Sequence, residues 1–273
     1  MPTEQSLGLL TFNIGNPSRE RAERQLKWLA QRPEEILVLT ETAASKGCDF
    51  LAERFSDAGY AVSFPVPGKG ERGVMLVSQL PLAEADSPVE IGYLPYRAVS
   101  VAVKTRQGPL DVVGLYVPSR DATPAKTERK QRFIDTCQGC LPSGASAVGR
   151  VVLGDFNILE PNHQPRYPIF RPFEYGFYQW FERHGYRDAY RHLHPDDQEY
   201  SWVGRTGDGY RYDHAFVSQT LDSLMISSSY VHEPRTTVRI SDHSGLSLSL
   251  ALPDLERLVV SDPTVVPEPD VLF

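Results

Sequence analysis

The chain alternates between short apolar runs and amphipathic segments, and the apolar runs have the length of β-strands. β-Branched and bulky residues fill these runs, and Gly or Pro residues separate several of them. Strands are predicted at residues 7–12, 35–41, 60–64, 73–78, 97–105, 110–117, 150–156, 199–204, 210–218, 223–230 and 245–252. In the last run Leu246, Leu248 and Leu250 alternate with small residues, which is typical of a half-buried strand.

Four other segments repeat their apolar residues with helical spacing, and helices are predicted at residues 19–32, 49–59, 124–139 and 172–185. About ten strands with a few helices indicate an α+β fold, in which two packed mixed sheets carry helices on their outer faces. Residues 1–252 are predicted to form one domain. Residues 253–273 are rich in Pro and acidic residues, and we expect a loose or docked extension there.

Polar side chains that can bind a metal or a phosphate stand where several predicted strands end or begin. The run at 150–156 passes directly into Asp155 and Asn157. A comparable position is taken by Asn13, Glu41, Asp213, Asp242 and His243. A turn or a helix cap explains each residue taken alone. Because strand ends and strand starts can meet at one rim of a mixed sheet, we expect these side chains to gather there.

This set of side chains favours one kind of chemistry. Carboxylate and amide oxygens are hard ligands that suit Mg²⁺, with Mn²⁺ as the alternative, better than zinc. Glu41 is the first choice of metal ligand, with Asp155, Asn13 and Asp242 around it. His243 beside the metal is expected to take a proton from water or to stabilise charge on a phosphoryl oxygen. Together these residues indicate attack of water on a phosphate ester.

Composition limits the alternatives. Of the 273 residues 41% are hydrophobic and 23% are charged, as in an ordinary globular protein. The net charge of −7 disfavours tight non-specific binding of nucleic acid over the whole surface, but is compatible with a local basic surface. Three cysteines make no disulfide framework, the N-terminus does not read as a signal peptide, and no apolar run is long enough to span a membrane. We expect a cytoplasmic monomer without a membrane segment.

The chain resembles the endonuclease/exonuclease/phosphatase superfamily in eight motifs that occur in order, LLTFNIGN, LVLTE, GVMLVS, LYVPS, GDFNI, YSWVG, RYDHAFVS and SDHSGL. Within it, the chain is most similar to the exonuclease III-like apurinic endonucleases. Each motif alone is weak evidence, and their order and spacing carry the resemblance, which covers about residues 7 to 252. It implies a four-layer α/β/β/α sandwich with the site at one rim of the two sheets.

The resemblance also implies a role for each matching residue. Glu41 matches the metal-binding Glu, and Asn13 matches the Asn near the metal and the phosphate. Tyr116 matches the Tyr that contacts the phosphate. Asp155 matches the Asp that positions or activates water, and Asn157 matches its phosphate-binding neighbour.

The remaining matches lie in the last third of the chain. Asp213 matches the Asp that orients the catalytic His. Asp242 and His243 match the terminal pair, with Asp242 on the metal side and His243 as the catalytic His. Both Asp155 and His243 are candidates for the base that activates water.

Several positions depart from the nuclease pattern. Ser119 replaces the Asn that usually follows YVP, Thr40 replaces the Gln before the metal-binding Glu, and Gly15 stands where an acidic residue is common. The segment between YSWVG and RYDHAF is also shorter than the aromatic stretch that helps to form the lesion pocket of abasic-site enzymes. These departures weaken the case for one particular DNA lesion.

Basic and aromatic residues interleave in residues 163–181, a combination that can stack bases and hold phosphates. Periodicity assigns the helical half to the core. Arg166 and Arg171, in the loop half, are expected to bind the substrate phosphate. A basic helix face, which a solvated surface explains equally well, is formed by Lys126, Arg129, Lys130 and Arg132.

The sequence therefore predicts a metal-dependent phosphodiester hydrolase, first of all a DNA nuclease of the exonuclease III/AP endonuclease type that acts through an activated water. The alternative is a hydrolase of a small phosphoester, such as a nucleotide or a metabolite. The negative net charge, Ser119 and the short segment after YSWVG favour this alternative. A third hypothesis is an inactive nucleic-acid-binding relative, against which the presence of the whole residue set argues.

Overall fold

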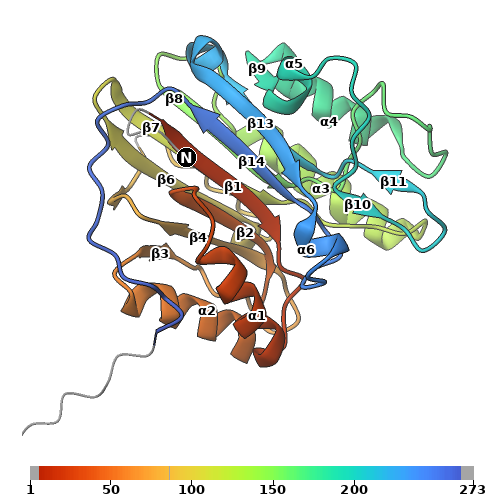
Figure 1. Cartoon of the computed structure of the whole chain (residues 1–273). Helices are drawn as coiled ribbons and strands as arrows, with labels where there is room; N and C mark the ends of the chain where they lie inside the picture. The colour runs from red at the N-terminus through yellow and green to blue at the C-terminus, as the bar shows by residue number, and fades with distance from the viewer. Residues whose placement is uncertain (1–5, 86, 266–273) are drawn as a thin grey trace, which may run out of the picture.

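In the computed structural model, which describes residues 6–85 and 87–265, two six-stranded sheets pack face to face (Figure 1). The first sheet has the strand order β13-β14-β1-β2-β4-β3. Its strands are β1 (Leu7–Asn13), β2 (Ile36–Thr42), β3 (Ala61–Ser63), β4 (Gly73–Ser78), β13 (Met225–Val231) and β14 (Gly245–Leu250). Strands β1 and β2 are parallel and the other neighbours are antiparallel, so the sheet is mixed.

The second sheet has the strand order β5-β6-β7-β8-β12-β9. Its strands are β5 (Leu82–Ala83), β6 (Ala98–Thr105), β7 (Gly108–Tyr116), β8 (Gly149–Asp155), β9 (Tyr186–Asp188) and β12 (Asp213–Ser218). Here β7 and β8 form the parallel pair. A separate two-stranded sheet joins β10 (Trp202–Val203) to β11 (Gly209–Tyr210).

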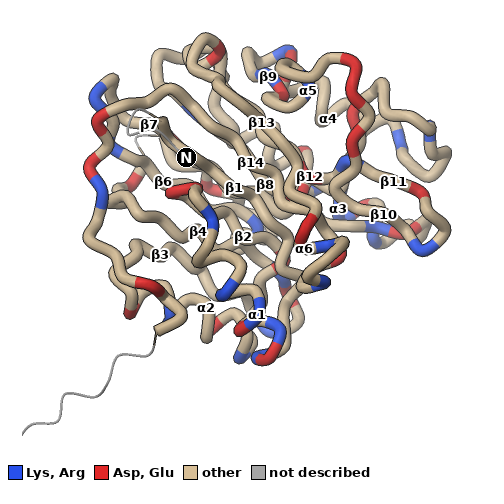
Figure 2. Tube along the Cα trace, in the orientation of Figure 1, with Lys and Arg blue, Asp and Glu red and all other residues tan. Residues whose placement is uncertain are grey.

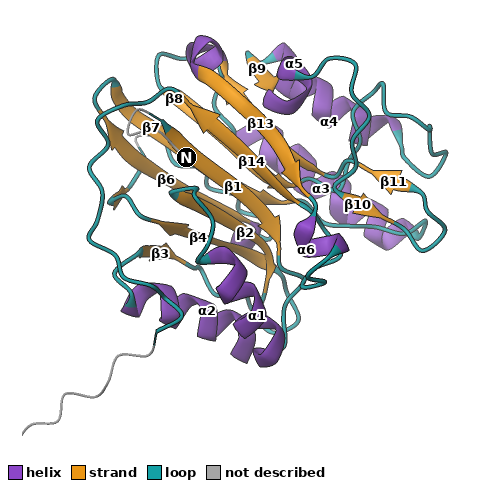
Figure 3. Ribbon diagram, in the orientation of Figure 1, coloured by secondary structure: helices purple, strands orange, loops and turns teal. Residues whose placement is uncertain are grey.

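Helices cover the outer faces of both sheets (Figure 3). The first sheet packs against α1 (Arg19–Leu29) and α2 (Lys46–Asp57), and the second packs against α3 (Pro124–Cys140) and α4 (Pro172–Arg183). The short helices are η1 (Pro95–Arg97), α5 (Ala189–Leu193), η2 (Gln219–Leu224) and α6 (Glu233–Thr236). The predicted α/β/β/α sandwich is confirmed.

Central strands are apolar on both faces because both faces are covered. In β2, Ile36 and Val38 point into the core between the sheets, whereas Leu37 and Leu39 pack against the helices. In β8, Val151 likewise points into the core between the sheets, and Val152 packs against the helices of the second sheet. This alternation sets the register of each strand, since a slip by one residue would exchange the two faces.

Local structure differs from the predicted elements in several places, including the predicted strand at 210–218, which is interrupted between β11 and β12. Helix α2 begins at Lys46, before the predicted residue 49, because the Ser45 hydroxyl caps it by accepting a hydrogen bond from the Cys48 amide at 3.4 Å. The predicted strand at 199–204 is reduced to the two residues of β10. Residues 186–193 form β9 and α5, which periodicity did not reveal because both elements are very short.

The described part of the predicted extension lies against the body of the first sheet. Leu255 is buried, and the Leu258 amide donates to the Gln79 carbonyl at 2.7 Å. Arg257 pairs with Glu35 at 2.8 Å. Residues 253–265 are therefore docked, and residues 266–273 lie outside the described residues. Among the described residues, no helix has both the length and the apolar character that crossing a membrane requires.

A buried ion-pair network joins the loop after β8 to β9, α5 and the start of β12. The Arg211 guanidinium is fully buried and lies 2.8 Å from both Asp188 and Glu160. Arg191 of α5 binds the same Glu160 at 2.8 Å, and His214 of β12 binds Asp188 at 3.0 Å. The network therefore fixes the loop after β8 to β12, the strand that begins with Asp213, which the sequence predicts to be catalytic.

Replacement of Arg211 should destabilise the protein strongly. Arg211→Met leaves two buried carboxylates without their shared cation, and we expect a loss of about 3–5 kcal/mol in the free energy of unfolding, measured in urea. The control is Arg187→Met, which breaks the exposed Arg187–Asp222 pair and should cost at most about 1 kcal/mol. Equal losses in the two variants would contradict the role given to the network.

Candidate active site

At one edge of the second sheet β7 and β8 end and β12 begins, and this brings three polar side chains together. In the register of this sheet Asp155 of β8 lies opposite Tyr116 of β7 on one side and opposite Asp213 of β12 on the other. All three residues are buried. The polar strand ends that the sequence predicts therefore meet because the hydrophobic alternation of β7, β8 and β12 leaves no other register.

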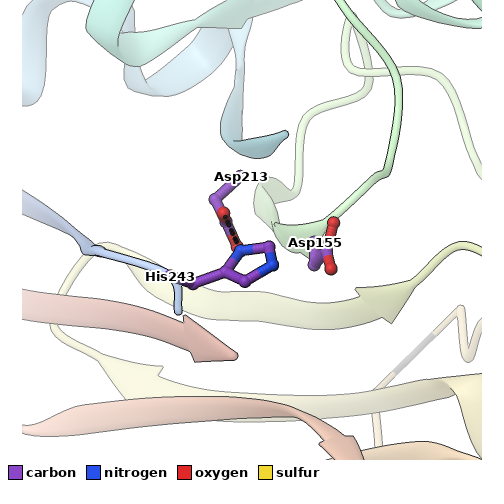
Figure 4. A group of neighbouring side chains, drawn as sticks. All are labelled: Asp155, Asp213 and His243. Carbon is purple, nitrogen blue, oxygen red and sulfur yellow. Dashed lines mark hydrogen bonds and ion pairs between the residues drawn. The ribbon is translucent and has the colours of Figure 1, made fainter. Parts of the chain in front are cut away.

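Asp213 binds His243, which comes from the segment just before β14 (Figure 4). The His243 Nδ1 lies 2.8 Å from the Asp213 carboxylate, and its other ring nitrogen points toward Asp155. Asp213 is itself held, because its amide donates to the Ser201 hydroxyl and its carbonyl accepts from the Tyr230 hydroxyl. The pair therefore presents the Nε2 atom of His243 in a defined direction.

The first sheet contributes the opposite side of the site. Asn13 ends β1, and its side-chain amide donates to Asp155 at 2.9 Å and to Glu41 at 3.2 Å. Glu41 sits at an irregularity between β2 and β4, with a φ of 58°. A non-glycine residue in this left-handed region is strained, and such strain is concentrated at functional sites. The Asn13 amide thus bridges one carboxylate from each sheet.

The loop after β8 holds Asp155 from the remaining side. The Asn157 amide donates to the Asp155 carboxylate at 2.9 Å, while the Asn157 side chain donates to the Val117 carbonyl at 3.1 Å. Asn157 has a φ of 50°, a left-handed conformation that Asn tolerates better than most residues. Asp155 therefore receives hydrogen bonds from the first sheet and from its own loop.

Tyr116 forms the floor of the site beside these carboxylates. The guanidinium of Arg97, itself buried, lies 4.5 Å from the centre of the Tyr116 ring and donates to the Tyr116 carbonyl. Burial, together with the nearby charges of Glu41 and Asp155, raises the pKa of Tyr116 well above its ordinary value. Tyr116 therefore stays a neutral phenol that can donate a hydrogen bond.

The two acid–base groups have pKa values that differ from their ordinary ones. Burial, and then the charge of Asp213, raise the pKa of Asp155 to about 7. Burial opposes the charged form of His243, but the charge and hydrogen bond of Asp213 outweigh it and raise the pKa of His243 to about 9. Asp213 therefore favours the cationic form of His243, while burial and the charge of Asp213 favour the protonated form of Asp155.

The donor set fits a hard divalent cation. Ligand atoms of Asp155, Asp213 and His243 lie within 4.8 Å of one another. Glu41 is linked to Asp155 because the Asn13 amide donates to both carboxylates. Several carboxylates there face one imidazole, so a cation would relieve their repulsion. Carboxylate oxygens suit Mg²⁺ or Mn²⁺ better than zinc. Glu41 keeps 31% of its side chain exposed, which leaves it accessible to an ion.

A cavity of about 280 Å³ opens over these residues. Glu41, Tyr116, Asp155, Asn157 and His243 form its floor. Its walls are formed by Ser119, Arg120, Lys130, Ile169, Phe170, Glu174, Trp202 and Tyr212. The cavity thus combines a polar floor with a partly aromatic wall, to which the long loop after β8 and the β10–β11 hairpin both contribute.

Comparison with known proteins identifies the family of this chain. The model of the Endonuclease/Exonuclease/phosphatase family matches residues 10–243, a span that includes every residue of the cavity floor and all strands of the two sheets except β14 and the start of β1. The chain belongs to this family. Among curated proteins, no sequence matches the chain significantly.

Solved structures of similar fold agree with the family. A 3′ phosphatase, NExo, from Neisseria, bound to a product DNA hairpin, is 22% identical with a TM-score of 0.76, covering 89% of this chain and 99% of its own. An AP endonuclease from Archaeoglobus fulgidus is 22% identical with a TM-score of 0.74, covering 90% and 100%. The AP endonuclease LMAP from Leishmania major is 18% identical with a TM-score of 0.71, covering 91% and 89%. At these identities the likeness shows the shared fold.

Some predicted site residues are placed differently from the expectation in this member of the endonuclease/exonuclease/phosphatase family. Arg166 and Arg171, expected to bind phosphate, are exposed and do not line the cavity, because their loop turns its aromatic side chains inward. Asp242, expected to bind the metal, is exposed and accepts a hydrogen bond from the Trp202 indole at 2.9 Å. The Asn13 side-chain oxygen accepts from the Gly15 amide at 2.8 Å, and its nitrogen is turned toward the two carboxylates.

Sequence reasoning missed residues in the cavity wall. Trp202 and Tyr212 stand in the motifs YSWVG and RYDHAFVS, so the place of Trp202 inside a motif and of Tyr212 next to Asp213 was a usable signal. Lys130 was assigned to a basic surface face and is instead buried. Arg120 and Glu174 carried no signal in the sequence, because Arg120 lies in the loop after β7 and reaches the cavity through its bond to Glu174 of α4.

The pKa of His243 should depend on Asp213. In metal-free protein, Asp213→Asn removes the main group that favours the imidazolium, and we expect the pKa of His243 to fall from about 9 toward its ordinary value of 6.5. Histidine ring signals followed by NMR over pH give this value, and His243→Gln identifies the signal. Because the folded pKa is raised, the stability that His243 contributes is complete below about 6.5 and is lost as the pH rises through about 9. An unchanged pKa in the variant would contradict the pairing.

Proposed function

We propose that this chain is a divalent-metal-dependent phosphodiesterase that cleaves DNA, in the manner of exonuclease III and the AP endonucleases. The observation that carries the proposal is the position of Asp155, which receives the bridging Asn13 amide on one side and faces the Asp213–His243 pair on the other. Such a centre suits attack of water on a phosphate ester. Because abasic sites and 3′ phosphates are forms of DNA damage, we include DNA repair in the proposal.

In the proposed reaction Asp155 takes a proton from the attacking water. The Asn13 and Asn157 amides hold its carboxylate in place for this step, and His243, whose protonated form the Asp213 carboxylate favours, donates from Nε2 to a phosphoryl oxygen. Tyr116 and Asn157 hold the other phosphoryl oxygens, and the leaving oxygen departs on the side opposite the water. Glu41 and Asp155 would hold Mg²⁺ or Mn²⁺, which supplies positive charge against the charge that develops on the phosphate.

The DNA substrate is supported by the structural neighbours, which include an AP endonuclease and a 3′ phosphatase bound to a product DNA hairpin. The aromatic wall of the cavity also suits an unstacked sugar or base. Hydrolysis of a small phosphoester is the second candidate. It is favoured because Arg166 and Arg171 lie outside the cavity, and because positive and negative residues are interspersed along the chain (Figure 2).

Hydrolysis should require a divalent ion and Asp155. We expect cleavage of abasic duplex, nicked duplex or 3′-phosphorylated duplex, loss of cleavage in EDTA, and recovery with Mg²⁺ or Mn²⁺. Asp155→Asn should lower kcat by about 10²–10⁴-fold, as loss of a general base does. The control Asp222→Asn, on the distant η2, should leave kcat unchanged. Cleavage that continues in EDTA, or in Asp155→Asn, would refute the proposed chemistry.

DNA binding separates the two candidate substrates. Asp155→Asn protein, titrated with fluorescent duplex and followed by anisotropy, should bind with a logarithmic salt slope of about −4.5 if some five phosphates are contacted. A substrate that is a small phosphoester predicts no such binding at about 50 mM salt. In that case single-strand, RNA and small-ester substrates in the same hydrolysis assay would identify the true class.

A further inference from the structure

A lysine is buried beside the loop that follows β8 and contains Asn157. Lys130 of α3 has only 1% of its side chain exposed. Its ammonium donates to the Glu174 carboxylate at 2.6 Å and also to the main-chain carbonyl of Asn157. Burying a charged side chain is costly, so a buried lysine needs a specific role to account for it. One of the two partners of this lysine, Asn157, belongs to the site.

The position of Lys130 follows from the periodicity of its helix. The residues of α3 that turn inward are Lys130, Phe133, Ile134 and Cys137, which have the spacing of one helix face. The three apolar members pack against the second sheet and α4. Lys130 therefore continues an apolar stripe, and the stripe ends under the loop that follows β8.

Glu174, in the first turn of α4, holds the lysine in place. One oxygen of this buried carboxylate accepts from Lys130, and the other accepts from the Arg120 guanidinium and from the Arg171 amide. Two cations thus share one carboxylate. Because Glu174 also pairs with Arg120, it does not fully neutralise the Lys130 ammonium. A second N–H group of this ammonium donates to the Asn157 carbonyl.

Asn157 is the residue on which this contact acts. Its amide donates to Asp155, its side chain donates to Val117, and its carbonyl accepts from Lys130. Asn157 also has a left-handed φ of 50°, a conformation that persists only where the surroundings hold it. Lys130 therefore holds the one main-chain polar group that neither Asp155 nor Val117 engages.

We propose that Lys130 is a positioning residue for hydrolysis, which acts by holding Asn157 so that the Asn157 amide stays directed at Asp155. Lys130 touches neither the water nor the phosphate in this role, and the inference rests on the proposed function. Removal of the ammonium lets the Asn157 peptide relax and turns Asp155 away from the attacking water. The effect is on the chemical step, since the cavity that receives the substrate keeps its aromatic wall.

Steady-state kinetics on the duplex substrate test this proposal. Lys130→Met keeps the side-chain length without the charge, and we expect kcat to fall about tenfold to hundredfold, because small misplacement of a reacting group has effects of that size. KM should change by less than about threefold, since substrate contacts are kept. Lys130→Arg can still reach both Glu174 and the Asn157 carbonyl, and should restore most of kcat.

A matched control removes another buried cation. Arg150 pairs with Asp111 near the start of β8, at the end of the strand away from Asp155, and both side chains are 1% exposed. Arg150→Met should lower the melting temperature at least as much as Lys130→Met and leave kcat unchanged. This comparison separates a role in positioning from a general loss of stability.

Coupling to Asn157 is the decisive measurement. In an Asn157→Gly background, which lacks the side-chain bond to Val117 and gives the peptide more freedom to move, Lys130→Met should lower kcat by less than about twofold more, because residues that act as a unit are not additive. Should Lys130→Met not fold, the double variant Lys130→Met/Glu174→Gln removes both charges and must show the same fall in kcat, since it still lacks the donor to Asn157.

Two outcomes would overturn the inference. One is a Lys130→Met variant with the kcat of the wild type, and the other is a fall in kcat that adds fully to that of Asn157→Gly. Failure of the proposed function has a different signature, because the wild type and Arg150→Met would then also lack metal-dependent hydrolysis of the duplex.

Discussion

The structure depends on keeping the Asp155 carboxylate buried where the two sheets meet. Taking a carboxylate out of water is costly unless donors and opposite charge surround it. Here the donors come from β1 through Asn13 and from the following loop through Asn157, and the opposite charge comes from His243. The packing of the sheets and the geometry of the site are therefore one constraint. A slip of one residue in any of these strands would remove a partner and bury an apolar side chain in its place.

Much of this centre could be predicted from the sequence because it lies at strand ends. Alternation of apolar residues determines where a strand ends and which face each residue takes, so Asn13, Asp155 and Asp213 could be assigned to one rim. Side-chain details could not be assigned in the same way. The pattern does not reveal that Asn13 turns its nitrogen to the carboxylates, because the Gly15 amide that captures its oxygen belongs to the following turn.

Charged residues in loops and helices were harder to place for a related reason. Composition marks residues 163–171 as basic and aromatic, but the loop can direct only one kind of side chain inward, and the aromatic rings gain more from burial. Phe170 and Tyr167 pack onto Tyr210, and Arg166 is left in solvent. Lys130 is the reverse case, because a lysine in an otherwise amphipathic helix is expected outside unless the fold supplies a buried carboxylate. That carboxylate comes from a helix more than forty residues later.

The distribution of charge explains how an acidic chain can have a site for an anionic substrate. The centre itself is rich in carboxylates and needs a cation, whereas the wall behind it holds Lys130 and Arg120 against the single carboxylate of Glu174. Potential at a cleft depends on the charges that line it, and buried charges are screened less than those on the outer surface. The net charge of −7 therefore reports on the surface as a whole and says little about the cavity. A hydrolase built in this way relies on ordered charges close to the phosphate, and the hydrogen bonds that keep these charges ordered also join the two sheets.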